Sequence, residues 1–528
     1  MIAGPGSTPP ARAGRFFPWI RAATPALPLL LAALAGVAHT LSFAPFGLPA
    51  LQPAALAVLI GLAQREASWR GAARLGFAFG LGWFALGMSW VYISMHTYGE
   101  MPAWMAVPAT GALVAYLAVY PALAAALAHR ASARPALRLL LAWPGAWALT
   151  EWLRGTLLGG LPWIASGYAH TDGPLSGFAP IVGVYGLCLL AAVLAGAVVL
   201  LLRERSTAPR FAALAVALAL IAGGTMLRRV EWTGPAGAPL KVKLIQGNIA
   251  QDLKFADGGT QLAVERYFPM MPDAPGAHSD LVVLPESAFP LPLNDLPADV
   301  RQWLLDFPGE QHNALIFGTF LEEPDERIYN SAVGLQPEQP MQRYSKRHLV
   351  AFGEFVPFGF HWLMQLVKIP IGDQDRGAPY QPPMQLAGQR IAVNICFEDL
   401  FGGEIIAAWR EPALEPTMLL NLSNLGWFND SLALPQHLQI ARMRALETGL
   451  PLLRATNTGA TAIIDPHGRV LAQLPFLQTA ALRGEVSGFR GRTPYVMHGD
   501  LSAMALALAL LVASLAAGRG PTARARET

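Results

Sequence analysis

The sequence is poor in charged residues and in cysteine. Of its 528 residues, 14% are charged and 53% are hydrophobic, whereas charged residues make up about a quarter of an ordinary soluble domain. A mainly soluble chain is therefore excluded. The net charge is only +3, which is not the basic surface of a nucleic-acid-binding protein, so we expect no nucleic-acid partner. Two cysteines, Cys188 and Cys396, leave no framework of disulfides.

The sequence also lacks the motifs that hold common cofactors. It contains neither a glycine-rich phosphate loop nor a cluster of metal ligands, so we expect no cofactor and no metal. It has no internal repeat of the kind found in soluble repeat proteins. A secondary transporter is typically built from two halves with matching Gly- or Pro-broken segments, and the arrangement described next is asymmetric.

Long apolar stretches take the place of the missing charge. About 20 apolar residues cross a bilayer. Eight stretches are candidate spans: residues 24–41, 49–63, 75–96, 104–129, 135–153, 181–202, 211–227 and 501–518. The second is short. No small-residue cleavage site follows the first, so we interpret it as a retained span and not as a signal peptide.

The arginines predict how these spans are oriented. They cluster before the first span and in residues 65–74, 130–138, 203–210 and 519–526, whereas the short loops 42–48 and 97–103 carry no Lys or Arg. The positive-inside rule therefore places both termini in the cytoplasm. With seven spans before it, the polar block from about residue 240 to residue 490 lies outside, which in a bacterium is the periplasm.

The polar block has the pattern of an α/β domain. Period-two or continuous apolar runs predict strands at residues 241–246, 280–284, 314–319, 390–396, 417–422, 452–455 and 461–464. Helices fit residues 259–270, 297–305, 403–410 and 434–448. Strands that alternate with helices indicate a layered α/β domain. The predicted organisation is a disordered start (1–23), a seven-span membrane domain (24–230), a periplasmic catalytic domain (240–490), an eighth helix (500–518) and a cytoplasmic tail (519–528).

Three residues in this block could supply the chemistry of a thiol nucleophile. Cys396 ends a predicted strand, Glu286 follows another, and Lys346 lies in a basic turn. Glu286 would act as the general base, with its pKa raised by partial burial, and Lys346 would favour the thiolate and stabilise an oxyanion. Each residue also has an ordinary interpretation: a buried core cysteine, a capping carboxylate and a solvated basic turn.

The joint pattern resembles a known superfamily. The segments Pro285-Glu-Ser-Ala, Lys346-Arg-His-Leu-Val-Ala-Phe-Gly-Glu-Phe-Val-Pro and Asn394-Ile-Cys-Phe-Glu-Asp are similar to the three motifs of the nitrilase (carbon–nitrogen hydrolase) superfamily. The segments 421–428 and 436–447 continue the resemblance. Residues 90–94, 151–154, 161–168 and 183–186 are similar to the membrane half of one branch, the apolipoprotein N-acyltransferases.

The resemblance implies an αββα sandwich on a membrane domain of eight spans in the bacterial inner membrane. It implies that Cys396 takes an acyl chain from a phospholipid as a thioester and passes it to the N-terminal amine of a diacylated apolipoprotein. By motif position Glu286 is the base, Lys346 stabilises charge and Cys396 is the nucleophile. Glu354 and Glu398 fall on two further important acids. The partners would be membrane lipids and the apolipoprotein, and we expect a monomer.

Several aromatic residues are predicted to contact substrate or form a lid. Phe255 and Phe397 stand where Trp and Tyr are common in the family, and Leu425 stands where many members carry Asp. Trp427 belongs to the same group of candidates. The segment 355–367, which includes Phe358 and Trp362, is too apolar for an ordinary exposed loop and predicts an interfacial lid; the alternative is a core helix.

Two other functions share part of this pattern. A membrane-tethered amidase or nitrilase would use the same three residues on a small carbon–nitrogen substrate. A lipid-binding or transport protein with an inactive domain would not need them at all. Eight spans are more than a tether requires, and all three positions carry the required residue types, so the acyltransferase is the function that the sequence favours.

Overall fold

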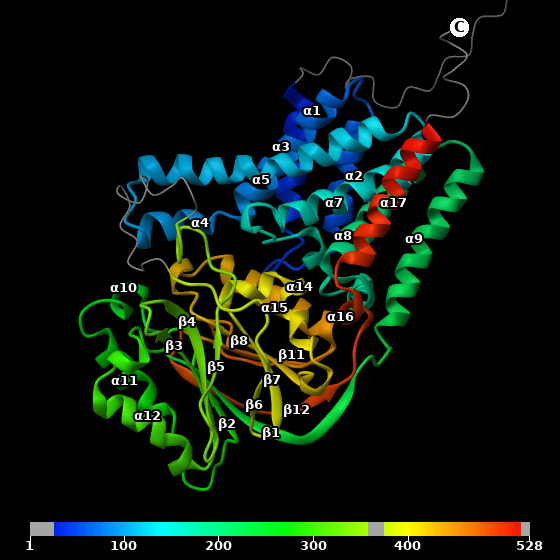
Figure 1. Cartoon of the computed structure of the whole chain (residues 1–528). Helices are drawn as coiled ribbons and strands as arrows, with labels where there is room; N and C mark the ends of the chain where they lie inside the picture. Colours follow the sequence, from blue (N-terminus) through cyan, green and yellow to red (C-terminus); the bar gives the residue numbers. More distant parts are fainter. Residues whose placement is uncertain (1–25, 357–373, 519–528) are drawn as a thin grey trace, which may run out of the picture.

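The computed structural model of the chain describes residues 26–356 and 374–518. The predicted disordered start (1–23), the predicted cytoplasmic tail (519–528) and the candidate lid residues Phe358 and Trp362 lie outside these ranges. The described chain has a helical part and a part built from two β-sheets, and Figure 1 shows the long helices gathered on one side of the sheets.

All eight predicted apolar stretches are helical. The long helices are α1 (Ala26–Thr40), α2 (Leu51–Ala63), α3 (Trp69–Gly87), α5 (Ala103–Ala131), α7 (Trp143–Arg154), α8 (Ala179–Arg203), α9 (Thr207–Leu227) and α17 (Leu501–Gly518). The stretch 75–96 divides between α3 and the short α4 (Trp90–Ile93), and a π-helical turn, Arg138–Ala142, precedes α7.

Among the described residues, fewer than eight of these helices meet the length and apolarity expected of a helix that crosses a bilayer. Within the described residues, three pass by length and apolar composition: Ala103–Ala131, Pro174–Arg203 and Thr207–Leu227. A fourth would be the pair Trp69–Gly87 and Trp90–Tyr98, which is bent by 53°. The helices Ala26–Thr40, Leu51–Ala63 and Leu501–Ala517 are apolar but shorter. The count of eight spans therefore stays a prediction.

The β part consists of two six-stranded mixed sheets. The first has the order β12 (Ala480–Arg490), β1 (Gly234–Gln246), β2 (Leu281–Val283), β3 (Ala314–Glu322), β4 (Ile328–Leu335), β5 (Gln342–Ser345). The second has the order β11 (Val470–Gln473), β10 (Ala462–Ile464), β9 (Leu452–Thr456), β8 (Met418–Ser423), β7 (Gln389–Ile395), β6 (Met384–Leu386). Each sheet has three parallel strands at its centre, β1–β2–β3 and β7–β8–β9.

The two sheets pack face to face between helices, which confirms the predicted α/β domain. One hydrophobic cluster lies between the sheets and joins residues of both, such as Leu244 and Leu420. A second packs the first sheet against α11 (Gly259–Tyr267) and α12 (Ala298–Gln311). A third packs the second sheet against α15 (Ala433–Thr448). All residues of β8 are buried, as expected for a parallel strand that is covered on both faces.

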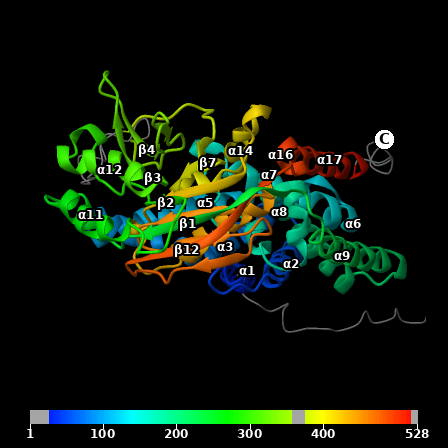
Figure 2. The same ribbon diagram turned by 90° about the horizontal axis from the view of Figure 1, so that it is seen from below.

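Helix α15 joins the two parts of the molecule. All but two of its 16 residues are buried, because one face covers the second sheet and the other packs against the helical part. Gln436 Oε1 accepts a hydrogen bond from Trp163 Nε1 at 2.8 Å, and Glu447 Oε1 accepts one from the backbone N–H of Val184 at 2.8 Å. Figure 2, which views the molecule from below Figure 1, shows β1 and β12 in front of the helical part.

The close contact of α1 with α3 gives a prediction about stability. A Cβ at Gly82 would lie 1.9 Å from the carbonyl oxygen of Ala33, whereas a Cβ at Gly61 in α2 would meet nothing within 4 Å. Small residues allow helix backbones to approach this closely. Gly82→Ala should lower the melting temperature in detergent, at a cost of about 1–3 kcal/mol. The matched variant Gly61→Ala should leave it unchanged or slightly higher, and equal melting temperatures for both variants would contradict this packing.

Candidate active site

The three predicted catalytic residues follow three different strands. Glu286 lies in the turn after β2, Lys346 comes directly after β5, and Cys396 comes directly after β7. Side chains at the carboxyl ends of strands open onto a common crevice in α/β domains. The structure brings all three together, with Glu354 from the loop that follows Lys346.

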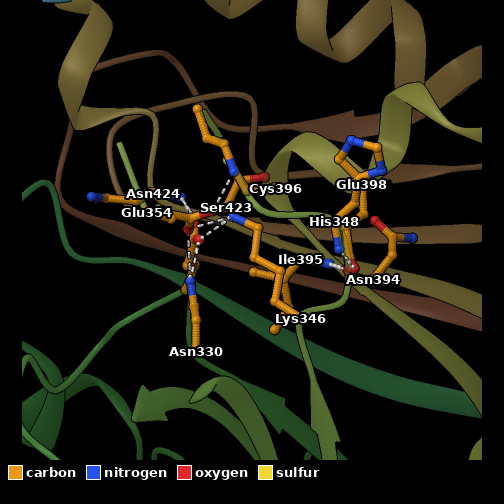
Figure 3. Close-up of polar contacts among 12 residues, drawn as sticks. Asn330, Lys346, His348, Glu354, Asn394, Ile395, Cys396, Glu398, Ser423 and Asn424 are labelled. Carbon is orange, nitrogen blue, oxygen red and sulfur yellow. Dashed lines mark hydrogen bonds and ion pairs between the residues drawn. The ribbon is translucent and has the colours of Figure 1, made fainter. Parts of the chain in front are cut away.

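The centre of the site is a buried lysine between two buried carboxylates. Lys346 Nζ lies 2.7 Å from Glu354 Oε1 and 3.2 Å from Glu286 Oε1. Asn330 Nδ2, from β4, donates to the same two oxygen atoms at 3.2 Å and 2.9 Å. The backbone N–H of Asn424 donates to Glu286 Oε2 at 2.8 Å. Figure 3 shows Lys346 and Asn330 converging on this group beside Cys396.

The backbone at Cys396 is strained in a way that presents the thiol. Its φ of 53° lies in the left-handed region, which is uncommon for a residue other than glycine and concentrates at functional sites. The chain turns there from β7 into a short 3-10 helix, Cys396–Leu400. The Cys396 carbonyl accepts hydrogen bonds from Asn421 Nδ2 at 3.3 Å and His437 Nε2 at 3.2 Å. These bonds hold the turn at Cys396, the predicted nucleophile.

A second buried hydrogen-bond network contacts the turn at Cys396. Arg454, on β9, donates to Asp399 Oδ2 at 2.8 Å, to Asn421 Oδ1 at 2.9 Å and to His437 Nδ1 at 2.9 Å. Because a guanidinium group can only donate, His437 Nδ1 must be the acceptor. The imidazole proton is thus on Nε2, which is the atom that faces the Cys396 carbonyl. Burial and the nearby Arg454 charge lower the pKa of His437, which keeps the ring neutral.

Glu398 holds the nucleophile turn against the loop that carries Lys346. Its Oε1 accepts from the backbone N–H groups of Arg347 at 2.7 Å and His348 at 3.1 Å. Its Oε2 accepts from the backbone N–H of Ile395 at 2.7 Å and from the Tyr344 hydroxyl at 2.9 Å. Figure 3 shows Glu398 near Ile395 and His348. These four hydrogen bonds tie the segment after β7 to the loop that carries Lys346.

The electrostatics of the site favour a neutral thiol at rest. Burial raises the pKa of Cys396, and the charges of Glu286 and Glu354 raise it further, while Lys346 and Arg454 oppose the rise. Burial alone would lower the pKa of Lys346, but Glu286 and Glu354 outweigh burial and raise it. The resting site therefore holds a thiol, a lysinium ion and ionised carboxylates.

The predicted rise in the pKa of Glu286 is wrong. Burial does favour a higher value, but the Lys346 charge and the Asn330 amide outweigh it, so the pKa of Glu286 lies below its ordinary value. The carboxylate is ionised and can accept a proton. It is a weaker base than the sequence suggested, because its negative charge is so well stabilised.

Phe358 and Trp362 lie outside the described residues, whereas the structure places two other predicted substrate-contacting residues, Phe397 and Trp427. Phe397 is half-buried and lies 5.3 Å from Phe401 between ring centroids. The Trp427 ring lies 6.1 Å from that of Tyr98, and its carbonyl accepts from Ser94 Oγ at 2.9 Å.

Two departures from the family's usual residues also lie close to the site. Phe255 follows the helical turn α10 (Gln251–Lys254). Leu425 is buried and has a φ of 55°. Asp and Asn tolerate this left-handed conformation better than Leu does, so the departure at Leu425 carries a backbone cost.

Sequence reasoning missed several residues of the site. Asn330 lies on a strand that was not predicted, and Lys254 carried no signal of its own. Arg454 did carry a signal: an arginine inside the apolar strand Leu452–Thr456 must be buried with partners. Within the described ranges, no three His, Cys, Asp or Glu side chains are grouped as a metal site.

Two family models match the chain. The model described as "Apolipoprotein N-acyltransferase N-terminal domain" matches residues 35–197, and the model described as "Carbon-nitrogen hydrolase" matches residues 221–487. They correspond to the helical part and to the two-sheet part with its helices. Among solved structures, a CN-hydrolase superfamily protein from Xanthomonas campestris aligns with a TM-score of 0.37 and 18% identity, over 53% of this chain and 97% of that one.

Full-length relatives match both parts at once. The apolipoprotein N-acyltransferase of Ralstonia nicotianae is 47% identical over 493 residues, which cover 93% of each chain. That of Bordetella bronchiseptica is 42% identical over 533 residues, covering 94% of this chain and 97% of its own. With this identity over nearly the whole length, the chain belongs to the apolipoprotein N-acyltransferase family.

Proposed function

We propose that the protein is an enzyme that transfers an acyl chain from a phospholipid to an apolipoprotein. The acceptor is the free α-amino group of the diacylglyceryl-modified cysteine at the apolipoprotein's N-terminus, and the product is the mature, N-acylated lipoprotein. Family membership supports the reaction, because the relatives with the matching length are named apolipoprotein N-acyltransferases. The geometry around Cys396 supports a route through a cysteine thioester.

The observation that carries the proposal is the surroundings of the nucleophile turn. Leu400 belongs to the same hydrophobic cluster as the apolar helices, and Phe397 and Phe401 pack against that cluster. The residue next to the proposed nucleophile therefore packs against the apolar helices. A thiol at such a boundary suits a donor with a polar ester and long hydrocarbon chains.

The first half-reaction forms the acyl-enzyme. Cys396 Sγ attacks the ester carbonyl carbon of the phospholipid while its proton passes to Glu286. Because the resting thiol is neutral, proton removal accompanies the attack. The Lys346 ammonium offsets the negative charge that develops. The ester C–O bond then breaks, the lysophospholipid oxygen takes the proton from Glu286, and the acyl group remains on Cys396 as a thioester.

The second half-reaction releases the acyl group. The apolipoprotein amine attacks the thioester carbonyl, Glu286 accepts a proton from the nitrogen, and the C–S bond breaks to return a protonated Cys396. An ester and a thioester are close in free energy, and the amide product is more stable than either, so this ping-pong cycle runs without a nucleotide. Glu354 keeps Lys346 in place, and Glu398 keeps the nucleophile turn in register with the Lys346 loop.

The proposal includes the location of the enzyme. Eight spans anchor the chain in the inner membrane of a bacterium, with the catalytic domain in the periplasm, both termini in the cytoplasm, and a monomer as the functional unit. The distribution of arginines supports this orientation. A small-molecule amidase is disfavoured because its substrate would not need the apolar boundary beside Phe397.

The two cysteines provide a matched test of the nucleophile. Cys396→Ala should abolish N-acylation of lipoproteins in cells that depend on this enzyme, with the protein level unchanged, because no other thiol lies at the site. Cys188→Ala should retain activity, since Cys188 is buried within α8. The fraction of N-acylated lipoprotein is read by mass spectrometry. Retained acylation in Cys396→Ala would favour a non-enzymatic, lipid-binding role.

The general base gives a second test. Glu286→Gln keeps the shape of the side chain but cannot take the thiol proton, so N-acylation of a diacylglyceryl peptide in micelles should fall by about 10²–10⁴-fold. The exposed Glu265→Gln serves as the control and should change nothing. A Glu286→Gln variant that folds and keeps more than a tenth of the rate would show that another group removes the proton.

A further inference from the structure

A second buried lysine lies beside the catalytic cluster. Lys254 is fully buried at the end of α10. Within residues 26–356 and 374–518, its ammonium makes one hydrogen bond, to the backbone carbonyl of Glu286 at 3.0 Å. The Phe255 ring centroid lies 5.9 Å from the same nitrogen. A fully buried lysine normally pairs with a carboxylate, and among the described residues Lys254 has no carboxylate partner at hydrogen-bond distance.

Among the described residues, one other buried lysine lies outside the catalytic cluster, and it shows the difference. Lys243 is fully buried too, but its ammonium lies 2.7 Å from Asp273 Oδ1 and donates to the carbonyls of Met271 and Pro272. Its charge is neutralised locally by Asp273. Lys254 lacks such a partner, so its charge acts on the groups of the active site.

The charge count of the catalytic cluster is incomplete without Lys254. Glu286 and Glu354 contribute two negative charges, and Lys346 contributes one positive charge. The net charge of −1 opposes formation of a thiolate at Cys396. One more cation within reach restores neutrality. An electrostatic interaction is mutual, and the charges of both Glu286 and Cys396 act on Lys254.

We propose that Lys254 is an electrostatic positioning residue whose positive charge offsets the second carboxylate and so favours the thiolate form of Cys396. The inference rests on the proposed role of Cys396 as nucleophile. The hydrogen bond to the Glu286 carbonyl holds the ammonium beside the turn that carries the base. Lys254 acts through the charge of the site and makes no bond to the reacting atoms.

The titration of Lys254 gives the proposal a distinctive pH signature. Burial lowers the pKa of Lys254 to about 7, against the opposing influence of Glu286 and Cys396. The Lys254 ammonium is bonded to the Glu286 carbonyl, its charge is influenced by Cys396, and Lys346 lies next to both Glu286 and Glu354. The positive charge is therefore present below about pH 7 and is lost as the pH rises above that value. Any contribution to the reactivity of Cys396 should fade over the same range.

The test measures the reactivity of the Cys396 thiol without any lipid. The full-length enzyme with Cys188→Ala is purified in detergent, and the rate of alkylation of Cys396 by iodoacetamide is followed by intact-protein mass spectrometry from about pH 6 to about pH 9. Lys254→Met removes the charge and the donor, Lys254→Gln removes the charge and keeps a donor, and Lys254→Arg keeps the charge at every pH.

The proposal predicts an order of rates. At neutral pH the Met and Gln variants should react about 10-fold more slowly than the parent, because a charge close to a thiol changes its ionisation by at least this factor. The Arg variant should react as fast as the parent at neutral pH and faster than the parent at high pH. At high pH the Met variant and the parent should react at the same rate, because the parent has then lost the Lys254 charge. The Gln variant keeps the proposal testable if the Met variant does not fold.

Three outcomes would overturn the inference. Equal alkylation rates in all variants would show that the Lys254 charge does not affect the reactivity of the Cys396 thiol. A Gln variant with the parent's rate would assign Lys254 to hydrogen bonding alone. An equal loss in Lys243→Met, the matched buried lysine, would show general destabilisation. Because no lipid is present, each outcome is separate from a failure of the proposed acyl transfer, which would appear as a reactive Cys396 that forms no acyl adduct.

Discussion

The active site depends on one buried ionic contact, the Lys346 ammonium between the carboxylates of Glu286 and Glu354. Burying three charges is costly unless they are paired and hydrogen-bonded. The Asn330 amide and the backbone N–H of Asn424 supply the missing hydrogen bonds. The contact keeps the Glu286 carboxylate ionised, and the thiol is neutral at rest, so the proposed mechanism requires a proton to leave Cys396 as its sulfur attacks.

The second constraint is the way the nucleophile turn is built between the catalytic domain and the helical part. His437, which accepts a hydrogen bond from Arg454, and Asn421 both donate to the Cys396 carbonyl, and Glu398 ties the same turn to the Lys346 loop. Phe397 and Leu400, from that turn, pack with the apolar helices. Helix α15 carries His437 and is buried on both faces. The position of the thiol is therefore coupled to the packing of the two parts.

The sequence predicted the fold where one physical signal dominated. The apolar strands β7 and β8 and the helix α15 were found because their residues are almost entirely buried or periodic. The strand β12 was missed because its residues alternate irregularly between buried and exposed and include two glycines, and with β4 missed, Asn330 could not be placed. The candidate residues Glu286, Lys346 and Cys396 were found from their motifs, but the direction of the Glu286 pKa depends on distances that no sequence pattern carries. Lys254 was not singled out from the sequence, because no sequence motif shows that a lysine is buried without a carboxylate partner among the described residues.

The acyl-enzyme is the central claim, and the most direct measurement is the intact mass of the detergent-purified protein after incubation with phospholipid alone. The account predicts an added acyl mass on Cys396 that neutral hydroxylamine removes, because thioesters are cleaved under conditions that leave amides intact. The mass should be absent when Glu286 or Cys396 is replaced. A folded protein that gains no mass with any of several phospholipids would contradict the account and move the function towards a small-molecule amidase.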